Sequence, residues 1–174
     1  AKDRYLQALR GLAISAVVLI HCLPQCAASV AIRPFLNFSV ALFLFLSGVL
    51  TDERKFNAGG GLRRRISKVA EPYAFWSVIY LAAFPAFMGV WFLAFAVGSV
   101  SAQMYYLLVH SQLVLLTPVL FRLLSRYRFF VYCVTPACLL LRELAAVAGI
   151  ALPLIQVFCP MWLIFYVFGL DWRR

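Results

Sequence analysis

Long apolar stretches alternate with short polar segments along most of the chain. A helix needs about 20 mainly apolar residues to cross the hydrocarbon core of a bilayer, within a range of about 17–25. Six stretches come near that length, and we predict that each forms a transmembrane helix. The six predicted spans are residues 6–30, 34–50, 72–88, 105–121, 129 to about 145, and 154–170.

A seventh apolar stretch, residues 91–97, is too short to cross a bilayer. It follows Pro85 and Gly89 and stops at Gly98. This pattern predicts a re-entrant or interfacial helix. The predicted fold class is therefore all-α: a polytopic transmembrane helix bundle of about six spans with one short additional helix.

Composition supports this assignment. Hydrophobic residues make up 65% of the chain and charged residues 13%, with a mean hydropathy of +0.93. Soluble domains are about 45–50% apolar and about 25% charged, so these few charges are too sparse to cover a water-soluble domain. The net charge of +10 does not indicate nucleic-acid binding, because the basic residues lie in short clusters between apolar stretches.

The basic clusters predict an orientation. If the N-terminus is cytoplasmic, 13 of the 16 lysines and arginines fall in inner segments. The opposite topology would place those residues outside, against the positive-inside rule. We therefore predict a multi-pass protein of the cell membrane, with both ends of this chain in the cytoplasm.

Two ionisable residues, Arg10 and His21, lie inside the first apolar stretch. Arginine at membrane depth costs about 2.5–3.5 kcal/mol on insertion scales, so such residues usually face a cavity or a partner. Eleven residues correspond to about three helical turns, which places both side chains on one face, about 16 Å apart along the axis. Alone, Arg10 is also consistent with a snorkelling interfacial base, and His21 with an interfacial histidine bonded to Gln25 or to backbone. Their alignment favours one site for an elongated ligand.

Arg63, Arg64 and Arg65, followed by Lys68, lead directly into the third predicted span. Two interpretations remain open for this basic run. It is either a topology anchor at anionic lipid headgroups or a phosphate-binding site at the mouth of a cytoplasmic cavity, because guanidinium groups match phosphate oxygens.

Two further groups are weaker candidates. His110, with Tyr105, Tyr106, Ser111 and Gln112 nearby, is either catalytic or a polar contact between helices, and the second role is favoured. Cys22 and Cys26 follow His21 and have a spacing that permits metal binding. No second pair of ligands completes such a site, so we predict no metal.

Four segments, in order, resemble the membrane-bound acyltransferase family 3. The family's R-x10-H signature is similar to the segment LRGLAISAVVLIH at residues 9–21. Its phenylalanine-rich second span, ending Ser-Gly-Phe-Leu, is similar to LFLFLSGVL at 42–50, where Val49 replaces the phenylalanine. Its basic entry to the third span and its Gln-Leu…Pro segment resemble LRRRISKVAEPYAFW at 62–76 and MYYLLVHSQLVLLTPVL at 104–120.

This resemblance implies transfer of an acyl group, usually acetyl, from cytoplasmic acyl-CoA to a hydroxyl of an envelope glycan or related surface molecule. It implies that Arg10 and His21 are the essential pair, and that residues 1–174 form one transmembrane acyltransferase-like domain. Members of the family usually have further spans after this region, so the resemblance also implies a domain that is incomplete at its C-terminal end.

For this chemistry, histidine is the residue type whose unperturbed pKa suits a general base at neutral pH, so His21 is a candidate general base and alternatively a covalent acyl relay. Arg10 would bind phosphate along the donor channel, and Arg63, Arg64 and Arg65 would hold the nucleotide end of acetyl-CoA. Two other function classes remain open. One is a carrier or permease for an anionic small molecule, because intramembrane Arg and His also occur in transporters. The other is a membrane module without acyl-transfer chemistry.

Overall fold

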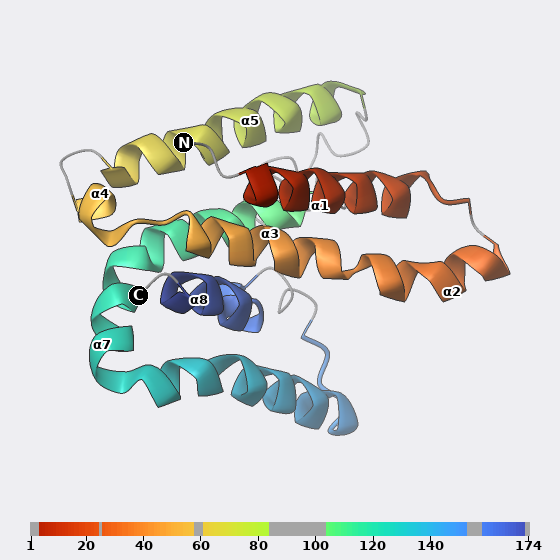
Figure 1. Ribbon diagram of the computed structural model, residues 1–174. Helices are drawn as coiled ribbons and strands as arrows, with labels where there is room; N and C mark the ends of the chain where they lie inside the picture. The colour runs from red at the N-terminus through yellow and green to blue at the C-terminus, as the bar shows by residue number, and fades with distance from the viewer. Residues whose placement is uncertain (1–3, 25, 58–60, 84–103, 153–157, 173–174) are drawn as a thin grey trace. The chain divides into compact units, whose positions relative to one another are not determined.

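The computed structural model describes residues 4–24, 26–57, 61–83, 104–152 and 158–172, and every regular element in these ranges is helical (Figure 1). The all-α prediction is therefore confirmed for this part of the chain. The elements are α1 (Arg4–Cys22), α2 (Ala27–Leu36), α3 (Phe38–Val49), α4 (Glu53–Asn57), α5 (Gly61–Ala83), α7 (Met104–Val147), the 3-10 helix η3 (Cys159–Met161) and α8 (Leu163–Trp172).

The chain forms two compact units, which we describe separately. The first unit contains Ala1–Thr51 and Phe165–Arg174, and the second contains Asp52–Ile164. Helix α8 therefore begins in the second unit and continues in the first. The prediction of one transmembrane domain over residues 1–174 stays a prediction.

Three helices in the described ranges are long and apolar enough to cross a membrane: Arg4–Cys22, Ala28–Val49 and Tyr105–Val147. Helix α1 has 19 residues, which at about 1.5 Å per residue approaches the thickness of the hydrocarbon core. Helix α8 is apolar but shorter. The count of six spans stays a prediction, and the predicted short helix at 91–97 lies outside the described residues.

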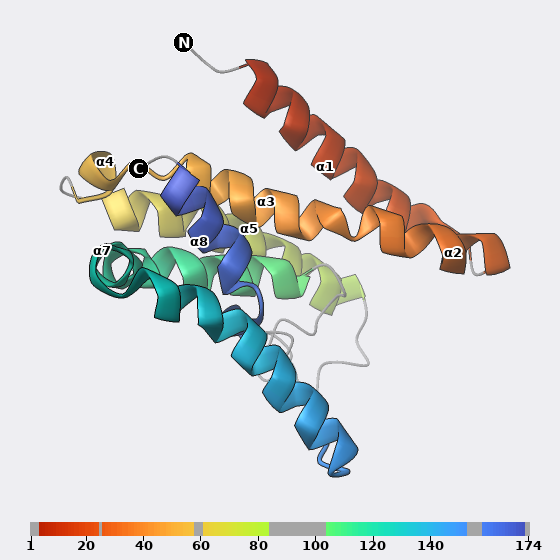
Figure 2. The ribbon, with the colours of Figure 1, turned by 60° about the horizontal axis from the view of Figure 1, so that its bottom comes forward.

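In the first unit the chain reverses direction after α1, and α1 packs mainly against α3 of the arm formed by α2 and α3 (Figure 2). The two buried residues of α1, Ala13 and Ala16, have small side chains, which allow close approach of a neighbouring helix. Several large apolar side chains of α1, such as Leu12 and Val18, are more than half exposed. Such a surface fits contact with lipid.

The predicted boundaries between the first two spans are wrong. Helix α1 ends at Cys22, whereas we predicted a span to residue 30, and α2 already begins at Ala27. The early end has a local cause, because a residue that precedes proline, here Leu23, disfavours the α conformation. Pro34 lies inside α2 and does not begin a span. Asn37, between α2 and α3, keeps an α-helical conformation (φ −64°, ψ −15°), so the two helices form one arm.

In the second unit, α5 packs against α7, and Phe56 of α4 lies edge-on to Phe121 of α7 with ring centroids 6.2 Å apart. Helix α7 has one non-helical residue, Tyr127 (φ −132°, ψ 41°), where it turns sharply (Figure 1). This turn lies between the stretches predicted as the fourth and fifth spans. Helix α5 begins at Gly61 and not at residue 72. It therefore includes the basic run, and its described residues are not among the apolar spans. Residues 84–88 of the predicted third span lie outside the described residues.

The stretch predicted as the sixth span is not one continuous helix in its described part. The 3-10 helix η3 and then α8 replace it, with α8 starting only at Leu163. Thr135 of α7 stabilises this irregular segment: its hydroxyl donates to the Pro160 carbonyl at 2.7 Å and accepts from the Ile164 N–H at 3.1 Å. Broken helices are tolerated at membrane depth where such backbone groups are satisfied.

Candidate functional site

Arg10 and His21 lie on one uninterrupted helix, α1, as predicted. At about 100° per residue, His21 is about 20° from Arg10 around the axis. On the same scale, the midpoint of the buried face, halfway between Ala13 and Ala16 around the helix axis, lies about 90° from Arg10 and about 110° from His21. Both side chains therefore flank the buried face of α1 instead of packing within it.

The two side chains differ in exposure. Arg10 is half-buried, whereas His21 is exposed near the last turn of the helix. A guanidinium that is partly shielded on an apolar helix gives a local positive potential that favours an anion. An exposed imidazole remains accessible to a substrate. The arrangement can thus hold an anionic group near Arg10 and present a proton acceptor about three turns away.

The backbone that follows His21 at the end of α1 is hydrogen-bonded to a side chain of α2. The Leu23 N–H donates to the Leu19 carbonyl at 3.0 Å, and the Arg33 guanidinium donates to the Leu23 carbonyl at 3.4 Å. Carbonyl groups at a helix C-terminus lack intrahelical partners, and a cation there also complements the helix dipole. The predicted orientation places Arg33 on the outer side of the membrane, between the first two spans. Its contact shows that it supports the helix end that carries His21.

The two cysteines next to His21 are free thiols on the surface. Cys26 lies before α2 at 3.2 Å from the Ser29 hydroxyl. Hydrogen bonds to the Ser29 side chain and backbone lower the pKa of the Cys26 thiol. The described residues contain no group of three or more His, Cys, Asp or Glu that could hold a metal ion.

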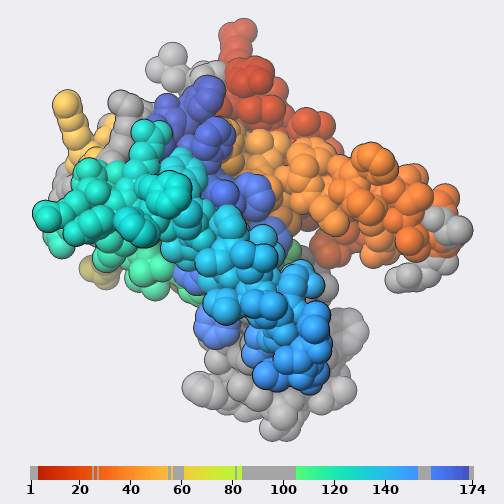
Figure 3. All heavy atoms as spheres, turned by 90° about the horizontal axis from the view of Figure 1, so that it is seen from below, coloured from red at the N-terminus to blue at the C-terminus, as the bar shows by residue number. Residues whose placement is uncertain are grey.

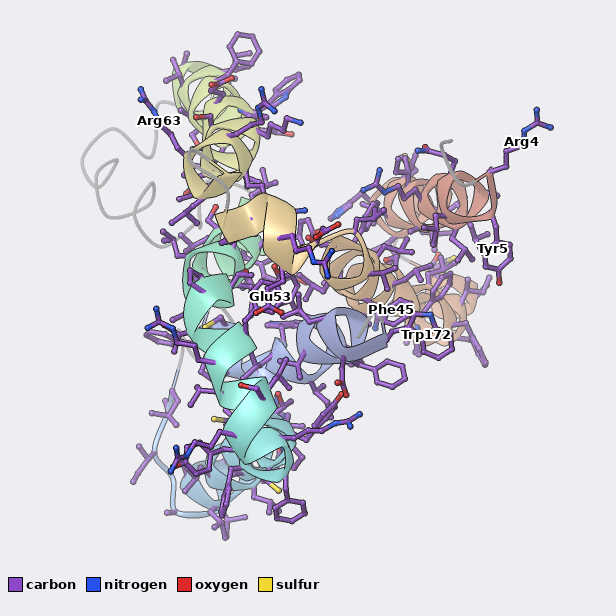
Figure 4. All side chains as sticks on the ribbon, turned by 60° about the vertical axis from the view of Figure 1, so that its left-hand side comes forward. Arg4, Tyr5, Phe45, Glu53, Arg63 and Trp172 are labelled. Carbon is purple, nitrogen blue, oxygen red and sulfur yellow. The ribbon has the colours of Figure 1, made fainter. Side chains whose placement is uncertain are left out.

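The Ser-Gly of the second motif has a structural role in the first unit. A Cβ atom added to Gly48 would lie 2.8 Å from the Leu170 backbone nitrogen and 2.9 Å from the Gly169 Cα atom of α8. Only glycine permits this approach of α3 and α8. Phe45, one turn before Gly48, extends the contact to Phe168 and Trp172, with ring centroids 5.5 and 6.4 Å away (Figure 4).

The basic run belongs to the second unit, on the first turns of α5. Arg63 and Arg64 are exposed, and Arg63 points away from the helix (Figure 4). Arg65 is half-buried, with its guanidinium 5.7 Å from the Phe56 ring centroid in a cation–π arrangement. The three arginines therefore differ: two are available to a soluble anion, and the third packs against the protein.

The polar residues around His110 support the structural interpretation. The Gln112 side chain accepts the Cys159 N–H at 2.9 Å and so connects α7 to η3, and the Ser111 hydroxyl donates to the Leu107 carbonyl of its own helix. The His110 ring stacks on Tyr106 with centroids 5.9 Å apart. The sequence pattern did not identify Thr135 or Gly169 as important, because their partners lie far away in the sequence.

A family model described as an acyltransferase domain matches residues 3–174. The match includes both Arg10 and His21 on α1 and the basic run on α5. Comparison with curated proteins and with solved structures gave no significant match.

Proposed function

This chain belongs to the acyltransferase 3 family of integral membrane enzymes, and from that premise we propose its donor, acceptor and site. The donor is cytoplasmic acyl-CoA, with acetyl-CoA the first choice, and the acceptor is a hydroxyl of an envelope glycan or related surface molecule. The protein lies in the cell membrane with about six spans and both ends of this chain in the cytoplasm. The clustering of 13 of the 16 basic residues in inner segments supports that orientation.

The observation that carries the proposal is the placement of Arg10 and His21 on one face of α1. Their separation of about 16 Å along the axis suits an extended ligand with an anionic end and a reactive end. Acyl-CoA has this form, since its phosphates and its thioester lie at opposite ends of the pantetheine arm. Arg10 would bind phosphate oxygens, and His21 would act at the thioester.

In the proposed reaction, His21 takes the proton of the acceptor hydroxyl, and the hydroxyl oxygen attacks the thioester carbonyl carbon. The carbon–sulfur bond then breaks, and the departing thiolate recovers the proton from His21. An imidazole suits both steps, because its ring nitrogen can accept a proton as a base and then return it as an acid. A covalent acyl-histidine relay remains the alternative role of the same residue.

The nucleotide end of the donor would bind Arg63, Arg64 and Arg65 of the second unit. The exposed guanidinium groups of Arg63 and Arg64 can form bidentate hydrogen bonds to phosphate. Arg65 contributes charge from a position fixed by Phe56. We therefore expect Arg63 and Arg64 to determine donor affinity more directly than Arg65 does.

A double-label experiment distinguishes this enzyme from a carrier of intact anions. Inverted membrane vesicles that contain the protein are supplied with acetyl-CoA labelled separately in its acetyl and adenine groups. The enzyme transfers the acetyl label to envelope molecules, whereas the adenine label stays in the medium as free-thiol CoA. Vesicles without the protein are the control. Equal movement of both labels into the vesicles, or no transfer of acetyl above the control, contradicts the proposal.

A further inference from the structure

The sharp turn of α7 forms a surface outside the site that we propose for acyl transfer, and we call it the α7 corner. It consists of Arg122, Arg126, Tyr127, Phe129 and Phe130. Helical geometry is broken at Tyr127. Arg122 and Arg126 precede this break and Phe129 and Phe130 follow it, so both pairs lie at the turn. Figure 3 shows the surface of this region in teal on the left of the view.

The aromatic side chains of the corner are strongly exposed. The exposed fraction is 74% for Phe129 and 68% for Phe130. Their rings lie edge to face at 5.9 Å, and Tyr127 lies 6.5 Å from Phe130. Exposed rings of this kind would be unfavourable in water, but aromatic residues are enriched where a membrane protein crosses the headgroup region. The corner therefore lies at a membrane–water interface.

The arginines of the corner point to an anion at that interface. Arg122 and Arg126 are exposed and are one helical turn apart, an arrangement in which like charges repel. The one acidic residue in the sequence of α7 is Glu143, which is already bonded to Arg142. Arg126 is held in place, since its Nε donates to the Tyr127 hydroxyl at 3.0 Å and its guanidinium lies 5.5 Å from the centre of that ring.

We propose that the α7 corner binds the headgroup phosphate of an anionic phospholipid. Arg122 and Arg126 hold the phosphate, and Phe129 and Phe130 lie at the level of the glycerol and upper acyl chains. A soluble anion would contact only the arginines, whereas a phospholipid contacts the arginines with its phosphate and the phenylalanine rings with its acyl chains. This inference does not depend on the chemistry proposed for His21.

The test compares the full chain with variants in nanodiscs of phosphatidylcholine that contain one fifth phosphatidylglycerol. Native mass spectrometry, after mild release from the disc, measures which lipid stays bound. Nanodiscs expose both membrane faces, so the orientation of the protein cannot explain the result. We expect the parent to retain phosphatidylglycerol in preference to phosphatidylcholine.

Replacing Arg122 and Arg126 with glutamine should abolish this preference. A basic residue near an anionic membrane surface contributes about fivefold in affinity, so loss of both predicts a decrease of about thirtyfold. The variant with lysine at both positions keeps the charge and should retain most of the preference. Arg4→Gln combined with Arg142→Gln removes the same charge elsewhere and should leave the preference unchanged.

Three results would overturn the proposal. The first is a parent protein that retains both lipids equally. The second is a glutamine double variant that still selects phosphatidylglycerol. The third is an equal loss in the Arg4 and Arg142 control, which would show that net charge and not the corner attracts the lipid. Rising salt should reduce the parent's preference, since screening weakens exposed charge interactions.

Discussion

Replacing Gly48 with alanine should separate α3 from α8 and destabilise the first unit. The new Cβ atom would meet the Leu170 nitrogen at 2.8 Å and the Gly169 Cα at 2.9 Å, with the Tyr166 carbonyl oxygen closer still. All three are backbone atoms, so no side-chain rotation can relieve the clash. Reaching ordinary van der Waals contact of about 3.4 Å requires a movement of about 0.6 Å at the Leu170 nitrogen and a larger one at the Tyr166 oxygen. Overpacking of this kind typically costs about 1–3 kcal/mol.

Gly11→Ala is the matched control, since a Cβ atom there meets nothing within 4 Å. Inside α1 this change should stabilise the protein by about 0.5–1 kcal/mol, because alanine loses less conformational freedom than glycine on folding. The stability of both purified variants is measured in detergent, by unfolding with heat or with an added denaturing detergent. The predicted difference in free energy of unfolding between them is thus about 1.5–4 kcal/mol.

Gly169→Ala approaches the same contact from the other helix, where its Cβ atom would lie 2.9 Å from the Val49 nitrogen and 3.0 Å from the Gly48 Cα. If helix separation is the cause, the double variant should lose less stability than the sum of the two single losses, because the first substitution already opens the gap. A Gly48→Ala protein as stable as the Gly11→Ala control would refute this reasoning.

Three further predictions concern the site and its surroundings. Arg33→Gln should lower kcat for acyl transfer while leaving the donor KM nearly unchanged, because it frees the end of α1 beyond His21, and Arg33→Lys should recover part of the loss. Ser29→Ala should slow alkylation of Cys26 at pH 7, since hydrogen bonds from Ser29 lower the pKa of that thiol and the thiolate is the reacting form; an unchanged pH–rate profile would contradict this. Replacing Arg63 and Arg64 together with glutamine should raise the dissociation constant for acetyl-CoA more than it lowers turnover, and unaltered donor binding by a fully inserted variant would show that they anchor topology only.

The sequence was sufficient for those features that depend on local patterns. Apolar length predicted the helices at α1, α3 and α7, although not α4 or the basic first turns of α5. The spacing of eleven residues placed Arg10 and His21 on one helix face. The fourth and fifth spans were predicted as separate stretches, ending at residue 121 and beginning at 129, and the turn of α7 at Tyr127 lies between them. The arginines of this segment favour such a turn, because charged residues are costly in the hydrocarbon core.

Other features depend on contacts that no local pattern reports. Gln112 bonds to a backbone group 47 residues away, and the reason for glycine at position 48 is the backbone of α8. The end of α1 was missed for a different reason, since residues 23–30 are still mainly apolar and only Pro24 marks the end of the helix. Pro34 was misinterpreted as a helix start because one missing N–H does not prevent the chain from continuing in helical geometry.

The most direct test of the account is the rate of acetyl transfer by His21→Gln at saturating acetyl-CoA, measured beside donor binding in the same membranes. Glutamine keeps hydrogen bonding and approximate size but cannot accept a proton at neutral pH. The account predicts near-parental donor binding with a rate reduced by about 10²–10⁴ or more. His110→Gln makes the same chemical change at the other histidine and should retain transfer. A His21→Gln protein that transfers acetyl groups at the parental rate would contradict the central claim.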